Sequence, residues 1–353
     1  MFGETPSRIL AGVLGCMALL PSAVSASHPH FGRGGHHHAG DGHHPSSARL
    51  GPAPTSAPDA GDDCDGAEPS AVSSAISSIL AVASSSAVAH VYPSASASAT
   101  VNTATSARVI IPFYVYPSAG AWTPMEELVS EFPDVEFTII INPDSGPGSS
   151  SLPDASFLSA VPALTSHSNV LAIGYVPTQK GTRAIADVEK DVKTYAGWPS
   201  ASGNSSFAVH GIFFDEAPNA YSADLVSYYQ QLATLVKDST GLGPENYVVT
   251  NPGTVPDAAY LDIPDSTVVF ESPYDSFLSA ISAGTFNSIS TTNHSSLASM
   301  VYSVPDSVDL PTLITQVGNI SEQIFLGNTS TYMAYDSYMN KVIPMLPTVA
   351  KSS

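Results

Sequence analysis

HGIFFDEAP, residues 210–218, joins four mostly apolar residues directly to two adjacent carboxylates and a proline. A strand that is apolar on both faces is typical of a parallel sheet covered by helices. In such sheets the chemistry gathers at the carboxyl ends of the strands, where Asp215 and Glu216 stand. If the pattern repeats along the chain, the sequence predicts a parallel α/β fold with its site at one edge.

The pattern repeats from Arg108 onward, with short β-branched runs alternating with helical stretches. We expect strands at 108–116, 135–142, 169–176, 207–216, 246–251, 267–271, 298–304 and 322–328. We expect helices at 123–132, 154–164, 182–196, 222–239, 275–282, 306–317 and 336–346, with only a short connection after the fifth strand. Thr123 before Pro124 predicts a helix cap, and Asp154 and Ser222 suit the same role.

Eight strand–helix units over residues 108–346 match the size of an α/β fold of the (β/α)₈ barrel type. The competing architecture is a doubly wound open sheet. Its usual dinucleotide-binding form has no support, because no G-x-G-x-x-G follows the first strand.

The chain before residue 108 has a different character. Residues 1–26 contain an Arg, an apolar run of about a dozen residues and a small-residue end at Ala26, which predicts a secretory signal peptide. The alternative, a membrane anchor, needs a longer apolar run. Residues 27–68 predict a disordered His/Gly/Asp-rich tail that could bind Zn²⁺ or Cu²⁺ loosely, and 69–107 a flexible Ser/Ala/Thr-rich linker.

We therefore expect a secreted, extracellular protein, associated with a cell wall in one reading, with no membrane span and a monomeric state. The formal charge of −20, from 31 acidic against 11 Lys and Arg residues, argues against nucleic acid as a partner. It suits either solubility or a cationic ligand. Four N-x-[ST] sequons predict surface glycosylation, at Asn204, Asn293, Asn319 and Asn328.

The expected strand tips are rich in tyrosine, asparagine and carboxylate, and they lack lysine and arginine. Tyrosine rings can stack on sugar faces and asparagine amides can bond sugar hydroxyls, so these tips suit carbohydrate. The candidate substrate-binding residues are Tyr114, Tyr116, Asn142, Tyr175, Asn251 and Tyr274. No metal site and no cofactor is expected, and mid-strand His210 is expected to be a core histidine.

Three acids are the catalytic candidates: Asp215, Glu216 and Glu271. Alternation along a strand sends Asp215 and Glu216 to opposite faces, so one acid would react while the other braces the site. Glu271, at the tip of the sixth strand, could face the reacting acid across the barrel mouth. A separation of about 5 Å would give retention of anomeric configuration, and about 6.5–9.5 Å inversion. The alternative is that these acids only cap the helices that follow them.

The motifs IIPFYVYP, TIIINPDSGPG, LAIGYVPT, GIFFDEAP and VVFESPY resemble the spherulin-4, or spherulation-specific family 4, proteins. Fungal members of this family form glycoside hydrolase family 135. The resemblance covers residues 108–346 and implies a (β/α)₈ barrel with endo-α-1,4-N-acetylgalactosaminidase activity on galactosaminogalactan, a partly deacetylated, cationic polysaccharide. It implies that Asp215 and Glu271 are the reacting pair, with Glu216 in substrate contact or support.

The leading hypothesis is thus a secreted endo-acting glycoside hydrolase without a cofactor. Asp215 would be the nucleophile or charge-stabilising carboxylate, and Glu271 the general acid. The second hypothesis is a catalytically silent wall or spore protein that binds glycan.

Overall fold

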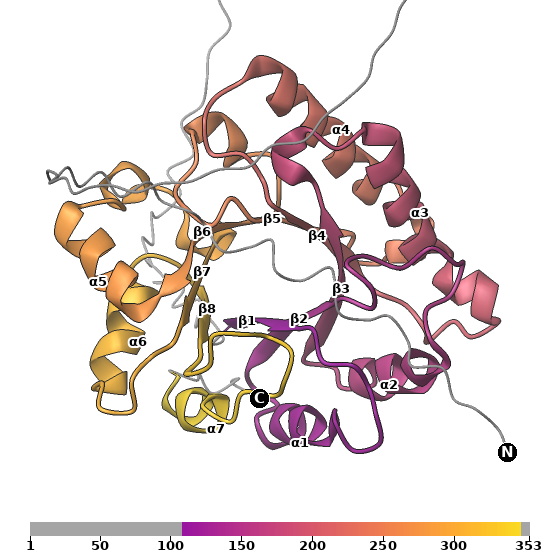
Figure 1. Ribbon diagram of the computed structural model, residues 1–353, viewed down its shortest axis with the longest axis horizontal. Helices are drawn as coiled ribbons and strands as arrows, with labels where there is room; N and C mark the ends of the chain where they lie inside the picture. The colour runs from indigo at the N-terminus through magenta and orange to yellow at the C-terminus, as the bar shows by residue number, and fades with distance from the viewer. Residues whose placement is uncertain (1–107, 347–353) are drawn as a thin grey trace, which may run out of the picture. The chain divides into compact units, whose positions relative to one another are not determined.

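The computed structural model describes residues 108–346, which form a closed barrel of eight parallel strands in sequence order (Figure 1). The predicted signal peptide, His-rich tail and linker lie outside the described residues. The first strand pairs with both the second and the eighth, which closes the sheet on itself. The predicted barrel is therefore confirmed, and the open-sheet alternative is wrong.

The strands begin close to their predicted positions, and several end earlier. They are β1 (Arg108–Phe113), β2 (Glu136–Ile141), β3 (Val170–Pro177), β4 (Gly211–Asp215), β5 (Tyr247–Thr250), β6 (Ser266–Pro273), β7 (Leu297–Tyr302) and β8 (Gln323–Leu326). The predicted fourth strand is too long at its start, because Phe207–Val209 are buried but lie outside the ladder.

Helices surround the barrel on its outer face (Figure 1). They are α1 (Thr123–Glu131), α2 (Ala155–Thr165), α3 (Ile185–Ser202), α4 (Ala223–Lys237), α5 (Tyr274–Ala283), α6 (Leu310–Gly318) and α7 (Met339–Val342). After β5 the chain makes only a short 3₁₀ turn, Ala258–Tyr260, as the sequence predicts.

The helix starts follow the predicted caps in two of three cases. Asp154 accepts a hydrogen bond from the Ser156 amide at α2, and Ser222 accepts one from the Leu225 amide at α4. Thr123 is not a cap, because it already lies inside α1 and Trp122 occupies the cap position. Trp122 is held there by its indole N–H, which donates to the Val115 carbonyl.

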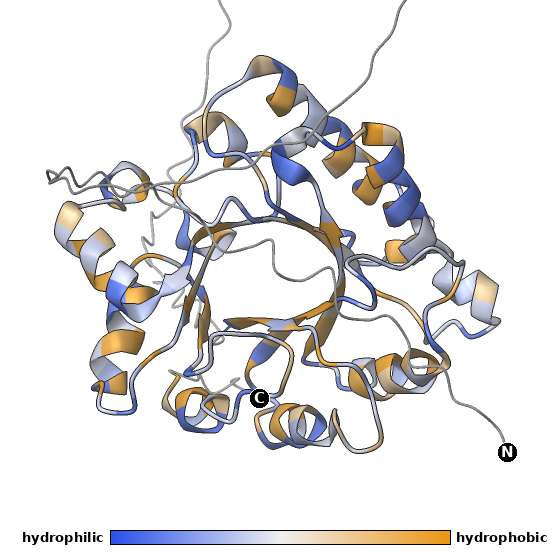
Figure 2. Cartoon of the chain, in the orientation of Figure 1, coloured by the Kyte–Doolittle hydropathy of each residue, from blue (hydrophilic) through white to orange (hydrophobic). Residues whose placement is uncertain are grey.

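The core consists of apolar strand side chains packed against the inner faces of the helices. In Figure 2 the strands are largely hydrophobic, while each helix carries both hydrophobic and hydrophilic residues. His210 is not a core residue: it precedes β4, and its Nδ1 lies 3.0 Å from the half-exposed Glu245 carboxylate. The apolar residues beside His210 in the sequence led to the wrong prediction that this histidine is buried.

A β-bulge in β6 affects the direction of the residues that follow it. The pairing with β7 passes from Val268 opposite Ala298 to Phe270 opposite Ser299, so Val269 is the extra residue. Because side chains alternate along a strand, one inserted residue reverses the faces of all later positions. The bulge thus sets the face on which Glu271, two residues further on, presents its carboxyl group.

All four sequon asparagines, Asn204, Asn293, Asn319 and Asn328, are exposed.

Within residues 108–346, none of the helices combines the length and apolarity that a membrane crossing requires.

Close packing between β3 and α3 gives a test of the fold. A Cβ at Gly174 would lie 2.8 Å from the ring of Tyr195, which is fully buried. Gly174→Ala should therefore lower the free energy of unfolding by roughly 1–3 kcal/mol, measured by urea denaturation.

Gly197 in the same helix is the matched control, since its added Cβ would meet open space. Gly197→Ala should leave stability unchanged or raise it by up to about 1 kcal/mol, because alanine favours helix. Equal effects of the two substitutions would contradict the packing described.

Candidate active site

Three neighbouring strands bring the central polar groups together at the carboxyl edge of the barrel. Asp215 is the last residue of β4, Asn251 directly follows β5, and Glu271 lies near the end of β6. Asp215 and Asn251 are buried, with 5% and 4% of their surface exposed. The parallel register makes this convergence possible, because all strand ends meet at one rim.

The amide of Asn251 bridges the two carboxyl groups. Its Nδ2 donates to Asp215 Oδ1 at 2.8 Å and to Glu271 Oε2 at 2.5 Å. Its Oδ1 accepts from the Gly253 backbone N–H at 2.9 Å, so the amide nitrogen faces the acids. Asn251 therefore has both amide hydrogens engaged by the carboxyl groups, whereas the sequence suggested that it would bond sugar hydroxyls.

This bridge limits the distance between the acids. Because bonds of 2.8 and 2.5 Å share one nitrogen, Asp215 Oδ1 and Glu271 Oε2 lie at most 5.3 Å apart. This upper limit for the two facing oxygens is compatible with the spacing of about 5–5.5 Å between the carboxyl groups of retaining glycosidases.

Two tyrosines complete the hydrogen bonding of the pair. The Tyr175 hydroxyl donates to Asp215 Oδ2 at 2.8 Å, and the Tyr332 hydroxyl donates to Glu271 Oε1 at 2.9 Å. The ring of Tyr114 lies between them, edge-on to Tyr175 at 5.4 Å and to Tyr332 at 5.7 Å. Each carboxyl group thus accepts one bond from a tyrosine and one from the shared amide.

Burial favours the protonated forms of both acids. It raises the pKa of Asp215 to about 7, and the neighbouring Glu271 adds to this rise, against the lowering effect of the bonds from Tyr175 and Asn251. Burial also raises the pKa of Glu271, opposed by its bonds from Asn251 and Tyr332. Two like charges this close resist joint ionisation, so the pair retains one proton near neutral pH.

Glu216 turns away from this pair. It has a left-handed backbone with φ of 56°, and its Oε2 accepts from the Gln179 backbone N–H at 3.2 Å. Its carbonyl oxygen accepts from the Lys180 amide at 2.7 Å. The structure therefore places Glu216 as a brace between the β3 and β4 loops, while Asp215 and Glu271 meet.

The other three predicted substrate-binding residues lie in loops or at the start of a helix. Tyr116 is 46% exposed, and its hydroxyl donates to Asp154 Oδ1 at 2.8 Å, which ties the first loop to the start of α2. Asn142 Oδ1 accepts from the Gly146 amide and holds the loop after β2. Tyr274, half-buried, opens α5 directly after β6.

Sequence reasoning missed Tyr332. It considered residues at the strand tips, whereas Tyr332 lies well beyond the end of β8, in the run TSTYMAYD. The sequence does contain a signal for it: two tyrosines, Tyr332 and Tyr335, occur in the polar loop after the last strand, at the same edge of the barrel as the acids.

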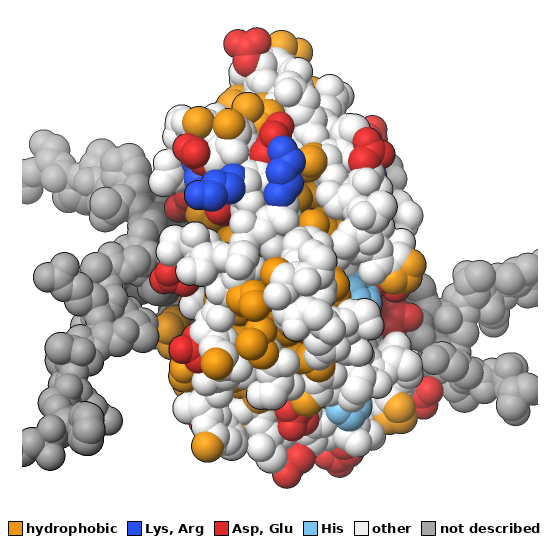
Figure 3. Space-filling model, turned by 90° about the vertical axis from the view of Figure 1, so that its right-hand side faces the viewer, with side chains coloured by type: hydrophobic (Ala, Val, Ile, Leu, Met, Phe, Trp, Pro, Cys, Tyr) orange, Lys and Arg blue, Asp and Glu red, His pale blue; other side chains and the backbone are white. Residues whose placement is uncertain are grey.

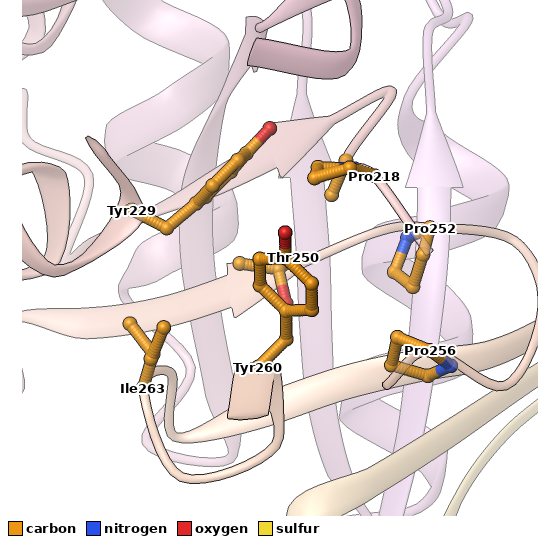
Figure 4. A pocket seen from close by; sticks show the side chains of 8 residues that line it. Pro218, Tyr229, Thr250, Pro252, Pro256, Tyr260 and Ile263 are labelled. Atoms are coloured by element: carbon orange, nitrogen blue, oxygen red, sulfur yellow. The ribbon is translucent and has the colours of Figure 1, made fainter. Parts of the chain in front are cut away.

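A small cavity beside the site is a product of loop packing. It is lined by Ala217, Pro218, Tyr229, Thr250, Pro252, Pro256, Tyr260 and Ile263 (Figure 4). Ala217 lies two residues after Asp215, and Pro252 directly follows Asn251, so this cavity adjoins the ends of β4 and β5.

Five of the seven lysine and arginine side chains in residues 108–346 form ion pairs with carboxylates. On the face seen in Figure 3, the lysine and arginine side chains stand beside carboxylates. Arg183 pairs with Asp191 at 2.6 Å, and Lys193 with Glu189 at 2.9 Å. Within residues 108–346, no cluster of three or more His, Cys, Asp or Glu residues is placed to hold a metal ion.

Comparison with known proteins identifies the family. The sequence pattern of spherulation-specific family 4 matches residues 108–346, the whole of the barrel. The chain belongs to this family. The acids, the bridging Asn251 and the tyrosines all fall within the matched family region.

The chain is similar to one curated protein and to one solved structure in particular. Spherulin-4 of Physarum polycephalum is 37% identical over 182 residues, which are 51% of this chain and 49% of that protein. This chain thus matches about half the length of its curated relative. The crystal structure of Aspergillus clavatus Sph3 in complex with GalNAc has a TM-score of 0.66 and 43% identity, covering 68% of this chain and 97% of Sph3.

Because the pKa of Asp215 is raised, we expect this residue to lower the free energy of unfolding at high pH. In the unfolded chain this carboxyl ionises near its usual pKa of 3.8, but in the fold only near 7. The folded state therefore binds more protons between these values, and stability falls as pH rises through that window. Asp215→Asn should remove this cost and stabilise the protein at pH 8, by roughly 1–3 kcal/mol.

Unfolding midpoints of both proteins at pH 4 and pH 8 check this expectation. The advantage of Asp215→Asn should be small at pH 4 and larger at pH 8. An advantage that is the same at both pH values would show that the folded pKa of Asp215 is not raised.

Proposed function

We propose that this protein is a secreted endo-acting glycoside hydrolase that cleaves α-1,4-linked N-acetylgalactosamine in galactosaminogalactan-type polysaccharide. The observation that carries the proposal is the Asp215–Glu271 pair, whose facing oxygens are held within 5.3 Å by the 2.8 and 2.5 Å bonds of Asn251. Membership of the family and the likeness to Sph3, solved with GalNAc, support the choice of sugar.

The spacing supports a retaining, two-step reaction. In the first step Asp215 attacks the anomeric carbon, the glycosidic C–O bond breaks, and Glu271 gives its proton to the leaving oxygen. In the second step Glu271 takes a proton from water, the resulting hydroxide attacks the same carbon, and the ester to Asp215 breaks. Glu271 is then protonated again and Asp215 is free.

A protein nucleophile fits the chemistry of this sugar. In an α-linked N-acetylgalactosamine the acetamido group lies on the same side as the leaving oxygen, so it cannot displace that oxygen from behind. In a retaining reaction the attack must therefore come from the enzyme. The pair retains one proton near neutral pH, and the proposed reaction requires this proton to lie on Glu271, with Asp215 ionised, when the sugar is attacked.

The tyrosines support the site in two ways. Burial raises the pKa values of Tyr114 and Tyr332 well above their usual range, so both hydroxyls stay protonated as donors. Their rings, with that of Tyr175, give the mouth an aromatic lining against which a sugar face can pack.

The decisive experiment is incubation of the full chain with purified galactosaminogalactan, followed by mass spectrometry of the soluble products. Asp215→Asn and Glu271→Gln should each lower the release of hexosamine oligomers by about 10³-fold or more, since the first removes the nucleophile and the second the group that protonates the leaving oxygen. Both variants should remain folded.

Asp144→Asn is the control, because Asp144 is an exposed acid in the loop after β2. Its rate should stay within about twofold of wild type, as is usual for surface changes. Binding of the polymer by wild-type protein without soluble products would favour the catalytically silent wall or spore protein.

The anomeric outcome tests the spacing of the acids directly. Proton NMR recorded within minutes of mixing should show the α-anomer of the new reducing end first, because two inversions restore the starting configuration. Initial appearance of the β-anomer would exclude Asp215 as a nucleophile.

A further inference from the structure

The loop after β8, residues 327–338, supplies a hydrogen bond to the acid that faces it. We call this segment the β8 loop. Tyr332 stands near its middle, and its hydroxyl donates to Glu271 Oε1 at 2.9 Å. Its ring lies edge-on to Phe325 at 5.7 Å and to Tyr302 at 6.4 Å. The position of Tyr332 therefore depends on how the β8 loop is held.

A buried carboxylate, Asp336, holds both ends of the loop. Its Oδ2 accepts from the Asn328 amide at 2.9 Å, the Thr329 amide at 3.2 Å and the Thr329 hydroxyl at 3.0 Å. Its Oδ1 accepts from the Tyr338 amide at 3.0 Å. Asp336 is 4% exposed, so these bonds replace the water that the charge has lost.

The ends of the β8 loop thus converge on one side chain, and Tyr332 lies between them in sequence. Asn328 and Thr329 precede it and Tyr338 follows it. The Tyr332 carbonyl also accepts from the Tyr114 amide at 3.1 Å, which fixes the middle of the loop to the end of β1.

Close packing at Gly327 shows how little room the Asp336 carboxylate has. A Cβ at Gly327 would lie 2.6 Å from Asp336 Oδ2 and 2.9 Å from the Phe325 ring. Any side chain at this position would displace the carboxylate or the strand end. A glycine at position 327 is therefore needed for Asp336 to bind both ends of the loop.

We propose that Asp336 is a positioning residue, which acts through the β8 loop to hold the Tyr332 hydroxyl on the Glu271 carboxylate. The catalytic consequence rests on the function proposed above. Because a hydrogen bond to the charged form favours ionisation, Tyr332 keeps the proton affinity of Glu271 lower than burial alone would make it.

Several titratable groups lie near Glu271, Tyr332 and Asp336 and could affect their pKa values. Glu271 is faced by Asp215 from β4, by Tyr114 from the end of β1 and by Tyr332. Tyr302 of β7 faces Tyr332. Asp336 is faced by Tyr335 and Tyr338, and Lys341 lies 5.2 Å from the Tyr338 ring.

The direction in which Asp336→Asn shifts the pKa of Glu271 shows whether Asp336 acts through Tyr332 or through its own charge. Neutralising Asp336 removes a negative charge, which by itself can only lower the pKa of Glu271. Releasing Tyr332 removes a donor to the Glu271 carboxylate, which raises that pKa. Asp336→Asn should therefore raise the pKa of Glu271 if Asp336 acts through the loop.

The experiment is a titration of the full chain with ¹³C-labelled glutamate carboxyl groups, followed by NMR, with the Glu271 signal assigned by its loss in Glu271→Gln. Tyr332→Phe and Asp336→Asn should both raise the pKa of Glu271, by roughly 0.5–1 unit. The double variant should show no further shift, since both changes break one chain of contacts. In a plot of activity against pH, the loss of activity at high pH should also shift to a higher pH.

A lowered or unchanged pKa in Asp336→Asn, or additive shifts in the double variant, would overturn the proposal. If Asp336→Asn does not fold, Thr329→Val serves instead, because it removes one of the four bonds to Asp336, together with the contact of the Thr329 hydroxyl with the Thr331 carbonyl. It should give a smaller shift of the same sign, and no shift would equally overturn the proposal.

Asp265→Asn is the matched control. Asp265 also accepts a backbone N–H, from Val248, and pairs with Lys237, but it precedes β6 at the opposite end of the barrel. It should lower stability without moving the pKa of Glu271. The NMR titration needs no substrate, so a wild-type protein that releases no oligosaccharide would refute the proposed function and leave this result standing.

Discussion

The amide of Asn251 donates at once to the buried carboxyl group of Asp215 and the half-buried one of Glu271, and the arrangement of the site depends on this contact. Two acids that close would repel each other if both ionised, and burial makes the repulsion stronger. The amide offers each carboxyl one hydrogen, while the Gly253 N–H fixes its orientation. The acids can therefore stay within 5.3 Å, the two bonds of 2.8 and 2.5 Å added, while they share a proton.

The barrel supplies the constraint that makes this contact possible. Asp215, Asn251 and Glu271 come from three consecutive strands, and a closed parallel sheet places the ends of those strands side by side. The bulge at Val269 adjusts the face of β6 before Glu271. The β8 loop then reaches back to the same acid through Tyr332, so the last strand of the barrel contributes to a site begun on β4.

The local rules succeeded where short-range chemistry dominates. Apolar runs predicted every strand, and the side chains of Asp154 and Ser222 cap their helices as expected. They failed where a distant group decided the outcome. Thr123 lies inside α1, one residue after the cap position, where Trp122 bonds to the Val115 carbonyl, and His210 lies beside Glu245 at the barrel end. The expected separation of Asp215 from Glu216 occurs for another reason: β4 ends at Asp215, and the left-handed backbone of Glu216, with φ of 56°, turns its side chain toward Gln179.

The sequence alone determined the eight-stranded barrel and the acids at two of its strand ends, because periodicity and strand-tip composition are local properties. Only the tertiary structure decided how these acids are used. The spacing of Asp215 and Glu271, the bridging role of Asn251 and the arrival of Tyr332 each depend on contacts between residues 20 to 61 positions apart in the chain. Such contacts follow from strand register, a bulge and loop closure, which no local pattern encodes.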